Sequence, residues 1–279
     1  MIRARHATAW MALVLAGLPV RAWARDLPLW EAGFGAAALS LPDYRGSNER
    51  HPYLLPLPYL VYRGDRLKVD REGLRARLFD NDRLDLNLSA AANFALRSRD
   101  NVARQGMPTL YPVVEVGPEL IYKIIGEKRS SMHLDLRIAT RAAFAIGGGR
   151  AAFEGWVTTP YLRLDLANAG GSGFEASFSA GPLFGDRRYH DYIYGVAPQF
   201  ATPGRGPYQA RAGYAGFQLL AGASRRFGDV WFGAFVRFDS LRGAAFESSP
   251  LVQSSRYLAA GLAVSWILGT STERVSDND

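Results

Sequence analysis

Polar and apolar residues alternate with a period of two along much of the chain. Within residues 83–96 every even position is apolar, whereas the odd positions include Asp85, Asn87 and Asn93. Successive side chains of a β-strand point to opposite faces, so this pattern predicts a strand with one apolar and one polar face. The same alternation recurs in residues 132–141, 161–166, 174–180 and, with weaker contrast, 257–268.

Two features of these segments favour a membrane barrel over a soluble sandwich, which also alternates. The polar faces carry repeated charges, as at Glu115, Glu119 and Lys123, while the apolar faces are almost uninterrupted. The segments also approach the ~9–11 residues of a tilted membrane strand, whereas strands of soluble proteins are usually about 5–6 residues long. We therefore predict an all-β fold, an antiparallel transmembrane β-barrel.

Twelve segments have the composition and length of barrel strands, and an even number is typical of bacterial single-chain barrels. They are residues 30–41, 52–62, 65–70, 73–79, 83–96, 110–125, 130–146, 154–166, 173–184, 211–226, 230–240 and 256–268. The hairpin of residues 65–79 is the least regular of these segments. Ten strands are therefore the alternative, if that hairpin stands clear of the membrane.

The lengths of the connections predict how the barrel is oriented. In such barrels the periplasmic turns are short and the outward loops are longer. Short turns are expected at residues 63–64, 80–82, 126–129, 168–172 and 227–229. The alternate connections are residues 42–51, 71–72, 97–109, 147–153, 185–210 and 241–255, and all except 71–72 are long. Both termini are therefore expected in the periplasm.

The first residues have the pattern of an export signal. Arg3 and Arg5 precede an apolar stretch over residues 7–20, and residues 22–24, "AWA", have the small-x-small form of a signal-peptidase site. We predict a cleaved signal peptide at 1–24, a barrel at 25–268 and a C-terminal tail at 269–279, in the outer membrane of a Gram-negative cell. An uncleaved N-terminal anchor is the alternative.

Charge and cysteine content exclude several other classes. Removing Arg3, Arg5 and Arg21 from the 33 basic residues leaves 30 against 26 acidic ones, so the net charge falls from +7 to +4. This excess is too mild and too evenly spread to predict a nucleic-acid partner. The chain has no cysteine, which excludes a lipoprotein and a disulfide framework. No apolar run reaches the roughly 18 residues of a membrane helix.

The predicted inward faces carry charges of both signs. They hold Arg75, Arg77, Arg83, Asp85, Glu115, Glu119, Asp135, Arg137, Arg163, Asp165, Glu175, Arg237 and Asp239. These groups can line a charged aqueous passage. They can equally form mutually satisfied ion pairs that fill a small barrel, because buried charges need partners. A barrel of this size allows both arrangements.

Candidate catalytic residues are sparse. His190 and Asp191 lie together in a predicted outward loop, where they could form half of a proton relay in a hydrolase. Neighbouring side chains of an extended chain point in opposite directions, however, so an aromatic loop near the membrane surface is the preferred interpretation. No nucleophile motif or metal-ligand spacing is present, and we predict no enzymatic activity and no cofactor. Tyr189, Tyr192, Tyr194, Trp231, Tyr257 and Trp266 are expected in interfacial aromatic girdles.

Four stretches resemble the MipA/OmpV family of outer-membrane proteins. The first is "PDYRGS", which contains Pro42, Asp43, Tyr44, Gly46 and Ser47. The second covers residues 55–79 and begins "LPLPYL", with Pro56 and Pro58 as its family-specific prolines. The others are residues 187–198, "RRYHDYIYGVAP", and 249–268.

This resemblance implies a function without catalysis. One branch of the family is described as a scaffold that joins a lytic murein transglycosylase to a bifunctional penicillin-binding protein in peptidoglycan synthesis and turnover. Such a partner surface would face the periplasm, at the short turns and the tail. Other family members are porin-like, so a small-solute channel is the alternative function. The tail departs from the usual aromatic ending of a barrel, and we expect it to be disordered.

Prolines within residues 52–62 are unexpected in a strand, because proline cannot donate to the strand ladder. This segment holds Pro52, Pro56 and Pro58; Pro56 and Pro58 share one face, and each removes one N–H from the ladder. If both missing donors face the same neighbouring strand, that side of the strand is unpaired there. We therefore predict an unpaired seam or bulge beside the first outward loop. A partner that docks at this seam is the functional alternative.

Overall fold

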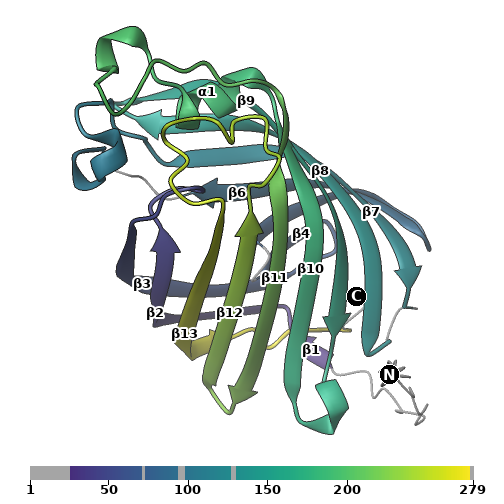
Figure 1. Cartoon of the computed structure of the whole chain (residues 1–279). Helices are drawn as coiled ribbons and strands as arrows, with labels where there is room; N and C mark the ends of the chain where they lie inside the picture. The colour runs from purple at the N-terminus through teal and green to yellow at the C-terminus, as the bar shows by residue number, and fades with distance from the viewer. Residues whose placement is uncertain (1–25, 71–72, 94–97, 127–129, 277–279) are drawn as a thin grey trace, which may run out of the picture.

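The computed structural model describes residues 26–70, 73–93, 98–126 and 130–276 (Figure 1). Within these residues, twelve antiparallel strands form a closed barrel in which each strand pairs with its neighbours in the sequence and β13 pairs with β2. The strands are β2 (Trp30–Pro42), β3 (Arg50–Arg63), β4 (Leu67–Asp70), β5 (Gly73–Asp80), β6 (Leu84–Asn93), β7 (Val113–Ile125), β8 (Met132–Gly147), β9 (Arg150–Leu166), β10 (Phe174–Gly185), β11 (Gly213–Phe227), β12 (Val230–Ser240) and β13 (Arg256–Thr270). The predicted signal peptide lies outside the described residues.

The predicted all-β antiparallel barrel of twelve strands is confirmed. The predicted strands agree with the observed ones except for a few residues at their ends, and β12 has the predicted bounds. The irregular hairpin joins the barrel as β4 and β5, between β3 and β6. The ten-strand alternative is therefore wrong.

The two faces of the barrel wall differ as the alternation predicts. Outward side chains are apolar and exposed: Leu54, Leu262 and Leu268 have exposed fractions of 79%, 66% and 78%. Inward positions include buried polar groups, such as Glu31 and Asp239, of which 1% and 0% are exposed. The apolar side chains of the strands thus face away from the barrel interior.

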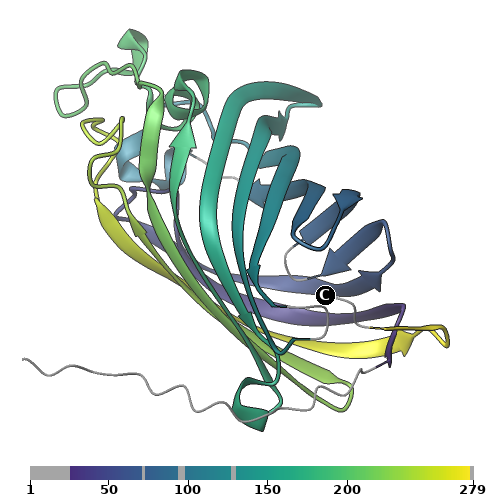
Figure 2. The same ribbon diagram turned by 90° about the vertical axis from the view of Figure 1, so that its right-hand side faces the viewer.

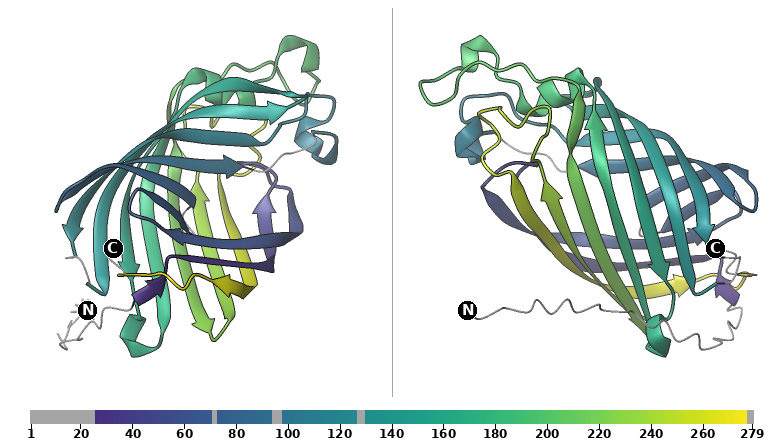
Figure 3. Two further views of the ribbon diagram at one scale, coloured as in Figure 1. Left: turned by 180° about the vertical axis from the view of Figure 1, so that it is seen from behind. Right: turned by 45° about the vertical axis from the view of Figure 1, so that its right-hand side comes forward.

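The long connections gather at one end of the barrel, beside the helix α1 (Arg187–Tyr194) (Figures 1 and 2). Short 3₁₀ turns lie in the connections as η1 (Ser98–Asp100), η2 (Val102–Arg104), η3 (Ala169–Gly171) and η4 (Pro198–Phe200). At the other end, β1 (Asp26–Pro28) pairs with β14 (Arg274–Ser276) in a separate two-stranded sheet (Figure 3). The described ends of the chain therefore lie side by side, away from α1.

Three local expectations are wrong. The connection at 147–153 is not a long loop, because β8 and β9 are joined by a tight turn at Gly148 and Gly149, whose positive φ values of 59° and 76° suit glycine. The tail is not wholly disordered, because residues 274–276 form β14. The third error concerns the aromatic girdles: Tyr194 and Tyr257 are buried.

Of the other girdle candidates, only Trp266 lies on the outer face of the barrel. The Tyr189 side chain reaches the barrel interior, and the Tyr192 hydroxyl bonds to the backbone of Tyr111. Trp231 packs against Tyr59, an inward residue of β3, whereas Trp266 is 51% exposed on the outer face. Aromatic content alone therefore did not distinguish residues of an outer girdle from those that fill the interior.

No helix among the described residues is long and apolar enough to cross a membrane.

Candidate functional site

The outward connections pack together into one folded unit, which we call the outer cap and define as residues 43–49, 98–112, 186–212 and 241–255. Its centre is a cluster of buried apolar side chains that come from all four of these segments. Tyr194 and Phe246 stack in it with ring centroids 3.7 Å apart, and 2% and 0% of these residues are exposed. The cap therefore has a core of its own beyond the barrel strands.

The first sequence motif lies at the base of the cap. Tyr44 is buried, packs edge-on against Tyr194 and donates its hydroxyl hydrogen bond to the backbone oxygen of Leu251, at 2.7 Å. Gly46 has a φ of +97°, which favours glycine, and its carbonyl accepts hydrogen bonds from the backbone N–H groups of Gln253 and Ser254. These contacts join the first outward connection to the last one.

The polar residues of the motif connect the same segment to a second loop. The Asn101 amide donates to Asp43 at 2.9 Å and to the Ser47 hydroxyl at 3.1 Å, and Asn101 is almost completely buried. The other Asp43 oxygen contacts His51 Nδ1 at 2.6 Å, and Pro42, the first residue of the motif, is the last residue of β2. The motif residues thus hold three loops and the barrel rim in one arrangement.

Arg45, inside the motif, joins the cap to the barrel interior. Its Nε lies 3.2 Å from an oxygen of Asp239, which is fully buried near the end of β12. Asp239 also accepts from Arg237 at 2.8 Å and from Gln218 at 3.1 Å. One carboxylate therefore serves two guanidinium groups and an amide.

Helix α1 was not predicted, and it corrects the interpretation of residues 185–210 as an extended loop. Asp186 caps it, accepting a hydrogen bond from the backbone N–H of Tyr189 at 2.8 Å. His190 and Tyr194, four residues apart, lie on its buried face. The N-cap aspartate and this spacing are the sequence signals that could have revealed the helix.

The structure separates His190 from Asp191. His190 is fully buried, its Nδ1 lies 2.6 Å from the carbonyl of Arg211, and its ring packs on Phe246 with centroids 4.7 Å apart. Burial lowers the pKa of His190. The Asp191 carboxylate instead accepts from the backbone N–H of Ala210 at 2.6 Å. The pair is a structural part of the cap, and the proton-relay hypothesis has no support from this geometry.

The inner side of the cap covers the barrel lumen. Tyr189 and Tyr192 of α1 pack on the buried residues Val113, Ala143 and Ala145, at the outer ends of β7 and β8. The Tyr189 hydroxyl also donates to Glu115, an inward carboxylate of β7, at 3.1 Å. Together with the Arg45–Asp239 contact, this places cap side chains against opposite sides of the lumen.

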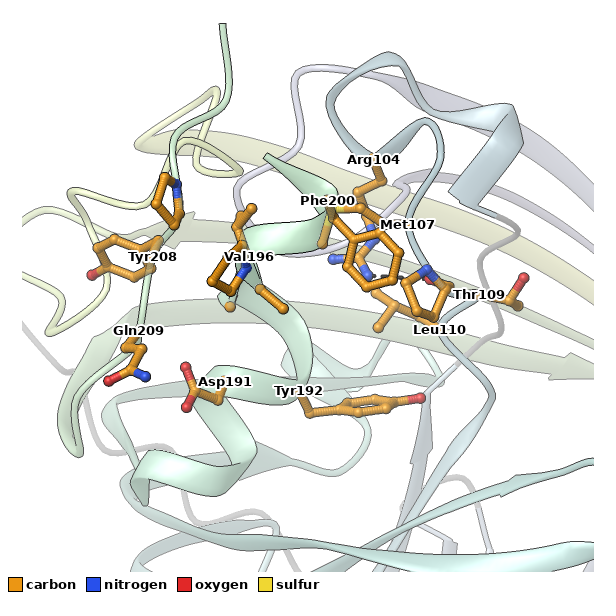
Figure 4. A pocket seen from close by; sticks show the side chains of 15 residues that line it. Arg104, Met107, Thr109, Leu110, Asp191, Tyr192, Val196, Phe200, Tyr208 and Gln209 are labelled. Atoms are coloured by element: carbon orange, nitrogen blue, oxygen red, sulfur yellow. Dashed lines mark hydrogen bonds between the residues drawn. The ribbon is translucent and has the colours of Figure 1, made fainter. Parts of the chain in front are cut away.

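The outer side of the cap has a cavity of about 580 Å³. Arg104, Met107 and Phe200 lie on one side of it, and Tyr208 and Gln209 lie on the other (Figure 4). Burial lowers the pKa of Arg104 to about 10, and its guanidinium already donates to backbone oxygens and to a serine hydroxyl of the cap. Among the described residues no cluster of side chains could hold a metal ion.

The lumen has a charged wall, formed by the inward side chains of β7, β8 and β9. Asp135 lies 2.9 Å from Arg137, and Arg163 lies 2.7 Å from Asp165. Glu119 accepts from the Tyr161 hydroxyl at 2.8 Å, and Arg141 lies 3.5 Å from the same carboxylate. Predicted inward charges are therefore present on this wall, and Asp135, Arg137, Arg163 and Asp165 are ion-paired. The prediction was wrong for Arg83, which lies before β6 and is exposed.

The lumen also has an apolar wall, formed by the inward side chains of β13, β2 and β3, which sequence reasoning did not single out. Its inward residues on β13 and β2 are mostly glycine and alanine, for example Gly33, Gly35 and Ala37 on β2 and Ala259 on β13. A side chain at Gly33 would collide with the backbone of Trp266, which shows how closely these strands pack. Glu31, paired with Arg63 and Arg226 at 2.9 Å each, lies at one end.

The family prolines lie on one edge of β3. The β2–β3 register runs without a shift, and the backbone N–H of Arg63 donates toward β2, to Leu29. Even-numbered residues of β3 therefore direct their N–H positions to the other side, toward β4. On that side β3 pairs with β4 only at Tyr62 and Arg63 among the described residues. The predicted seam is present there, at Pro52, Pro56 and Pro58.

Comparison with known proteins gives one family and several distant structures, two of which are described here. The sequence profile "MltA-interacting protein MipA" matches residues 34–268. The monoaromatic hydrocarbon channel CymD is 11% identical, with a TM-score of 0.36 over 87% of this chain and 89% of that one. The toluene transporter TbuX of Ralstonia pickettii is 11% identical, with a TM-score of 0.25 over 91% of this chain and 71% of that one. Both likenesses are too low to transfer a function.

No protein with a curated description matches the chain. The family match begins within β2 and ends within β13, so it spans the barrel and all four segments of the outer cap. Since it covers most of the sequence, the chain belongs to the MipA family of MltA-interacting proteins.

Proposed function

We propose that this protein is an outer-membrane barrel that acts as a non-enzymatic scaffold. In this role it binds a lytic murein transglycosylase and a penicillin-binding protein at its periplasmic end, in peptidoglycan synthesis and turnover. The observation that carries the proposal is the outer cap, which covers the outer mouth in a chain whose family is described by an interaction with MltA. A capped barrel suits a binding protein better than an open pore.

The outer surface supports the membrane location. Large apolar side chains are exposed around the barrel, among them Phe178 on β10, Phe232 on β12 and Leu262 on β13, with exposed fractions of 48%, 47% and 66%. Contact with water at so many apolar positions is unfavourable, whereas lipid accommodates them. The signal peptide predicted at 1–24 belongs to the same proposal, because outer-membrane barrels are exported.

The end opposite the cap supports the position of the partner surface. There β1 pairs with β14, and the Arg63 guanidinium donates to the backbone oxygen of Pro28 at 2.8 Å. The backbone N–H of Ser271 donates to Trp30 at 2.9 Å, so the tail beyond β13 is held against the barrel. This end combines short turns with an ordered two-stranded sheet, which offers a defined surface to a periplasmic protein.

The scaffold is tested with purified proteins. The barrel in nanodiscs is mixed at micromolar concentrations with a purified lytic transglycosylase and a purified penicillin-binding protein of the same cell, and complexes are followed by size-exclusion chromatography. We expect a complex of the three proteins. Deletion of residues 271–279 should weaken it at least tenfold, whereas Phe246→Ala in the cap should leave it unchanged. Absence of any complex with the folded barrel would overturn the proposal.

A small-solute channel is the second candidate, and one observation favours it. The Asp165 side chain on the charged wall retains an exposed fraction of 31% although it pairs with Arg163. Some inward charge is therefore accessible to water, which a solute passage would need. The cap opposes this function, and the conductance measurement that separates the two candidates is described below.

A further inference from the structure

The wall of the barrel is incomplete on one side of β3. β4 has only four residues, and its last residue, Asp70, already pairs with Gly73 of β5, so β4 does not reach the outer part of β3. β3 nevertheless continues to Arg50 and pairs with β2 along its whole length. Seen from behind, β3 diverges from β6 above the short β4–β5 hairpin (Figure 3). The even-numbered residues Pro52, Leu54, Pro56 and Pro58 therefore have no strand beside them among the described residues.

The opposite side of this opening is formed by β6, whose outer part also lacks a pairing strand on the side that faces the opening. β5 pairs with β6 up to Ser89 and no farther among the described residues. Inward residues of β6 are buried up to that point, as at Asn87 and Ser89, with exposed fractions of 6% and 4%. The next inward residues, Ala91 and Asn93, are exposed. The outer part of β6 is thus accessible on its inner face, as expected beside an opening in the wall.

The prolines remove the main energetic cost of such an edge in lipid. An unpaired backbone N–H in hydrocarbon costs several kcal/mol, which is why open sheet edges are absent from membrane barrels. Three of the five even-numbered positions from 52 to 60 are prolines and carry no N–H, so only Leu54 and Leu60 have a donor on this edge. The remaining carbonyls tolerate incomplete hydrogen bonding better than N–H groups do.

The inner face of β3 is apolar at the opening. Its inward side chains are Tyr53, Leu55, Leu57 and Tyr59, which are partly exposed, whereas Ala37 on the neighbouring β2 is buried, at 7%. Around the unpaired edge this inner face is continuous with the outer face of the same strand, where Leu54 is 79% exposed. Hydrocarbon can therefore pass from the outer surface of β3 to its inner surface without crossing a polar barrier on this strand.

We propose that this gap is a lateral opening and that it admits an acyl chain of a membrane amphiphile, which lies on the inner face of β3. The ligand class follows from the surface: an unbranched hydrocarbon chain matches the row Leu55, Leu57 and Tyr59, and the bilayer supplies it at the edge. The inference goes beyond scaffolding and shares with the proposed function only the location in a membrane. A second copy of the chain or a protein strand at the edge would instead shield this row from lipid.

The test measures how strongly lipids with brominated acyl chains quench the fluorescence of a label attached to the protein. The chain has no cysteine, so single cysteines carry a bimane label without background. Three variants are compared: Leu57→Cys on the inner face of β3, Leu262→Cys on the outer face of β13, and Ser177→Cys on the inner face of β10. Ser177 is the matched control, because its strand is paired on both sides at that residue, with Asp165 and Gly222. Each is reconstituted in phosphatidylcholine vesicles with and without brominated acyl chains.

We expect bromolipid to quench the label at residue 262 strongly, to leave the label at 177 unquenched, and to quench the label at 57 at least half as much as that at 262. If the labels at 57 and 177 behave alike while 262 is quenched, the lateral opening is refuted and the membrane location stands. If the label at 262 is not quenched in vesicles that contain the folded barrel, the membrane location itself is wrong.

Discussion

The charged wall and the apolar wall fill one lumen in different ways. On the charged wall, long side chains reach one another as ion pairs, such as Asp135 with Arg137 and Arg163 with Asp165. On the apolar wall, the glycines and alanines of β13 and β2 let the strands pack closely, and the larger residues of β3 border an unpaired edge. The comparison indicates that ion pairs make the charged wall rigid, whereas the small residues of the apolar wall leave room in the lumen and its β3 edge borders the proposed lateral opening.

The outer cap is tied to the charged wall and to β12, which borders the apolar wall, by different means. On the charged wall, aromatic side chains of α1 cover the ends of β7 and β8, and Tyr189 bonds to Glu115. On the other side the connection is ionic, from Arg45 to Asp239. Substitutions at these two contacts can therefore show separately how much each one contributes to holding the outer cap in place.

The largest effect is expected for Asp239→Ala, near the junction of the apolar wall and the cap. It leaves Arg45 and Arg237 without their shared, fully buried carboxylate, and removal of one partner from such a group costs about 3–5 kcal/mol. The free energy of unfolding in urea, measured on the reconstituted barrel, should fall by that amount. The matched control is Asp229→Ala, because this side chain is 85% exposed and its loss should cost less than about 0.5 kcal/mol. Equal effects of the two substitutions would contradict the account.

A smaller loss is expected on the charged wall for Glu119→Ala. The substitution removes the acceptor of the Tyr161 hydroxyl and the partner of Arg141, and we expect it to lower the free energy of unfolding by about 2–3 kcal/mol. Glu119→Gln keeps an acceptor for Tyr161 and should cost about half as much. A neutral Glu119→Ala variant would mean that water solvates Arg141, and the charged wall would then line an aqueous passage.

A third effect concerns acid and the cap above the charged wall. Burial lowers the pKa of His190, so the unfolded chain binds a proton near its ordinary pKa of about 6.5 while the folded cap does not. The contribution of this residue to stability is therefore present above pH 6.5 and is lost as the pH falls through the lowered pKa. The protection factors of the α1 amides, which compare the observed exchange with that of an unfolded chain at the same pH, should therefore fall in this range.

The control for this prediction is His190→Gln, which retains a donor for the carbonyl of Arg211 but does not titrate. The protection factors of its α1 amides should change less with pH than those of the unmodified protein. The same pH dependence in both proteins would show that groups other than His190 control the opening of the cap.

The smallest effect is expected on the apolar wall for Ser265→Ala. Ser265 is fully buried among small residues, and its hydroxyl has no hydrogen-bond partner among the described residues. Its removal should change the free energy of unfolding by less than about 0.5 kcal/mol, because no protein hydrogen bond is lost. A loss above 1 kcal/mol, measured in the same urea assay, would show that the apolar wall also depends on polar contacts.

Most of the barrel could be predicted from its sequence, because a period of two determines which side chains share a face. This alternation of polar and apolar residues identified the strands, the outward apolar surface and the inward charges, such as Asp135 and Arg137. The shared parity of Pro56 and Pro58 also indicated the unpaired edge, since proline removes a donor regardless of tertiary context.

The cap could not be predicted in the same way, because its structure depends on contacts between loops that are distant in sequence. Asn101 meets Asp43 and Ser47 across more than 50 residues, and Tyr44 bonds to Leu251 across 207. The aromatic residues of α1 were also compatible with a membrane girdle, and only the N-cap at Asp186 and the four-residue spacing of His190 and Tyr194 distinguished the helix. The end of β4 at Asp70 was predicted, but residues 65 and 66 lie in the connection before the strand, because the alternation alone does not show where a short strand begins.

The central claim is that the outer mouth is closed by the cap, and conductance in planar lipid bilayers tests it most directly. The purified barrel, shown to be folded by its resistance to urea, is inserted at defined protein-to-lipid ratios. The account predicts no steady open state for the unmodified protein, and channel openings after Tyr194→Ala together with Phe246→Ala, which removes the stacked pair at the centre of the cap. Reproducible open channels in the unmodified protein would contradict the account and favour a solute channel.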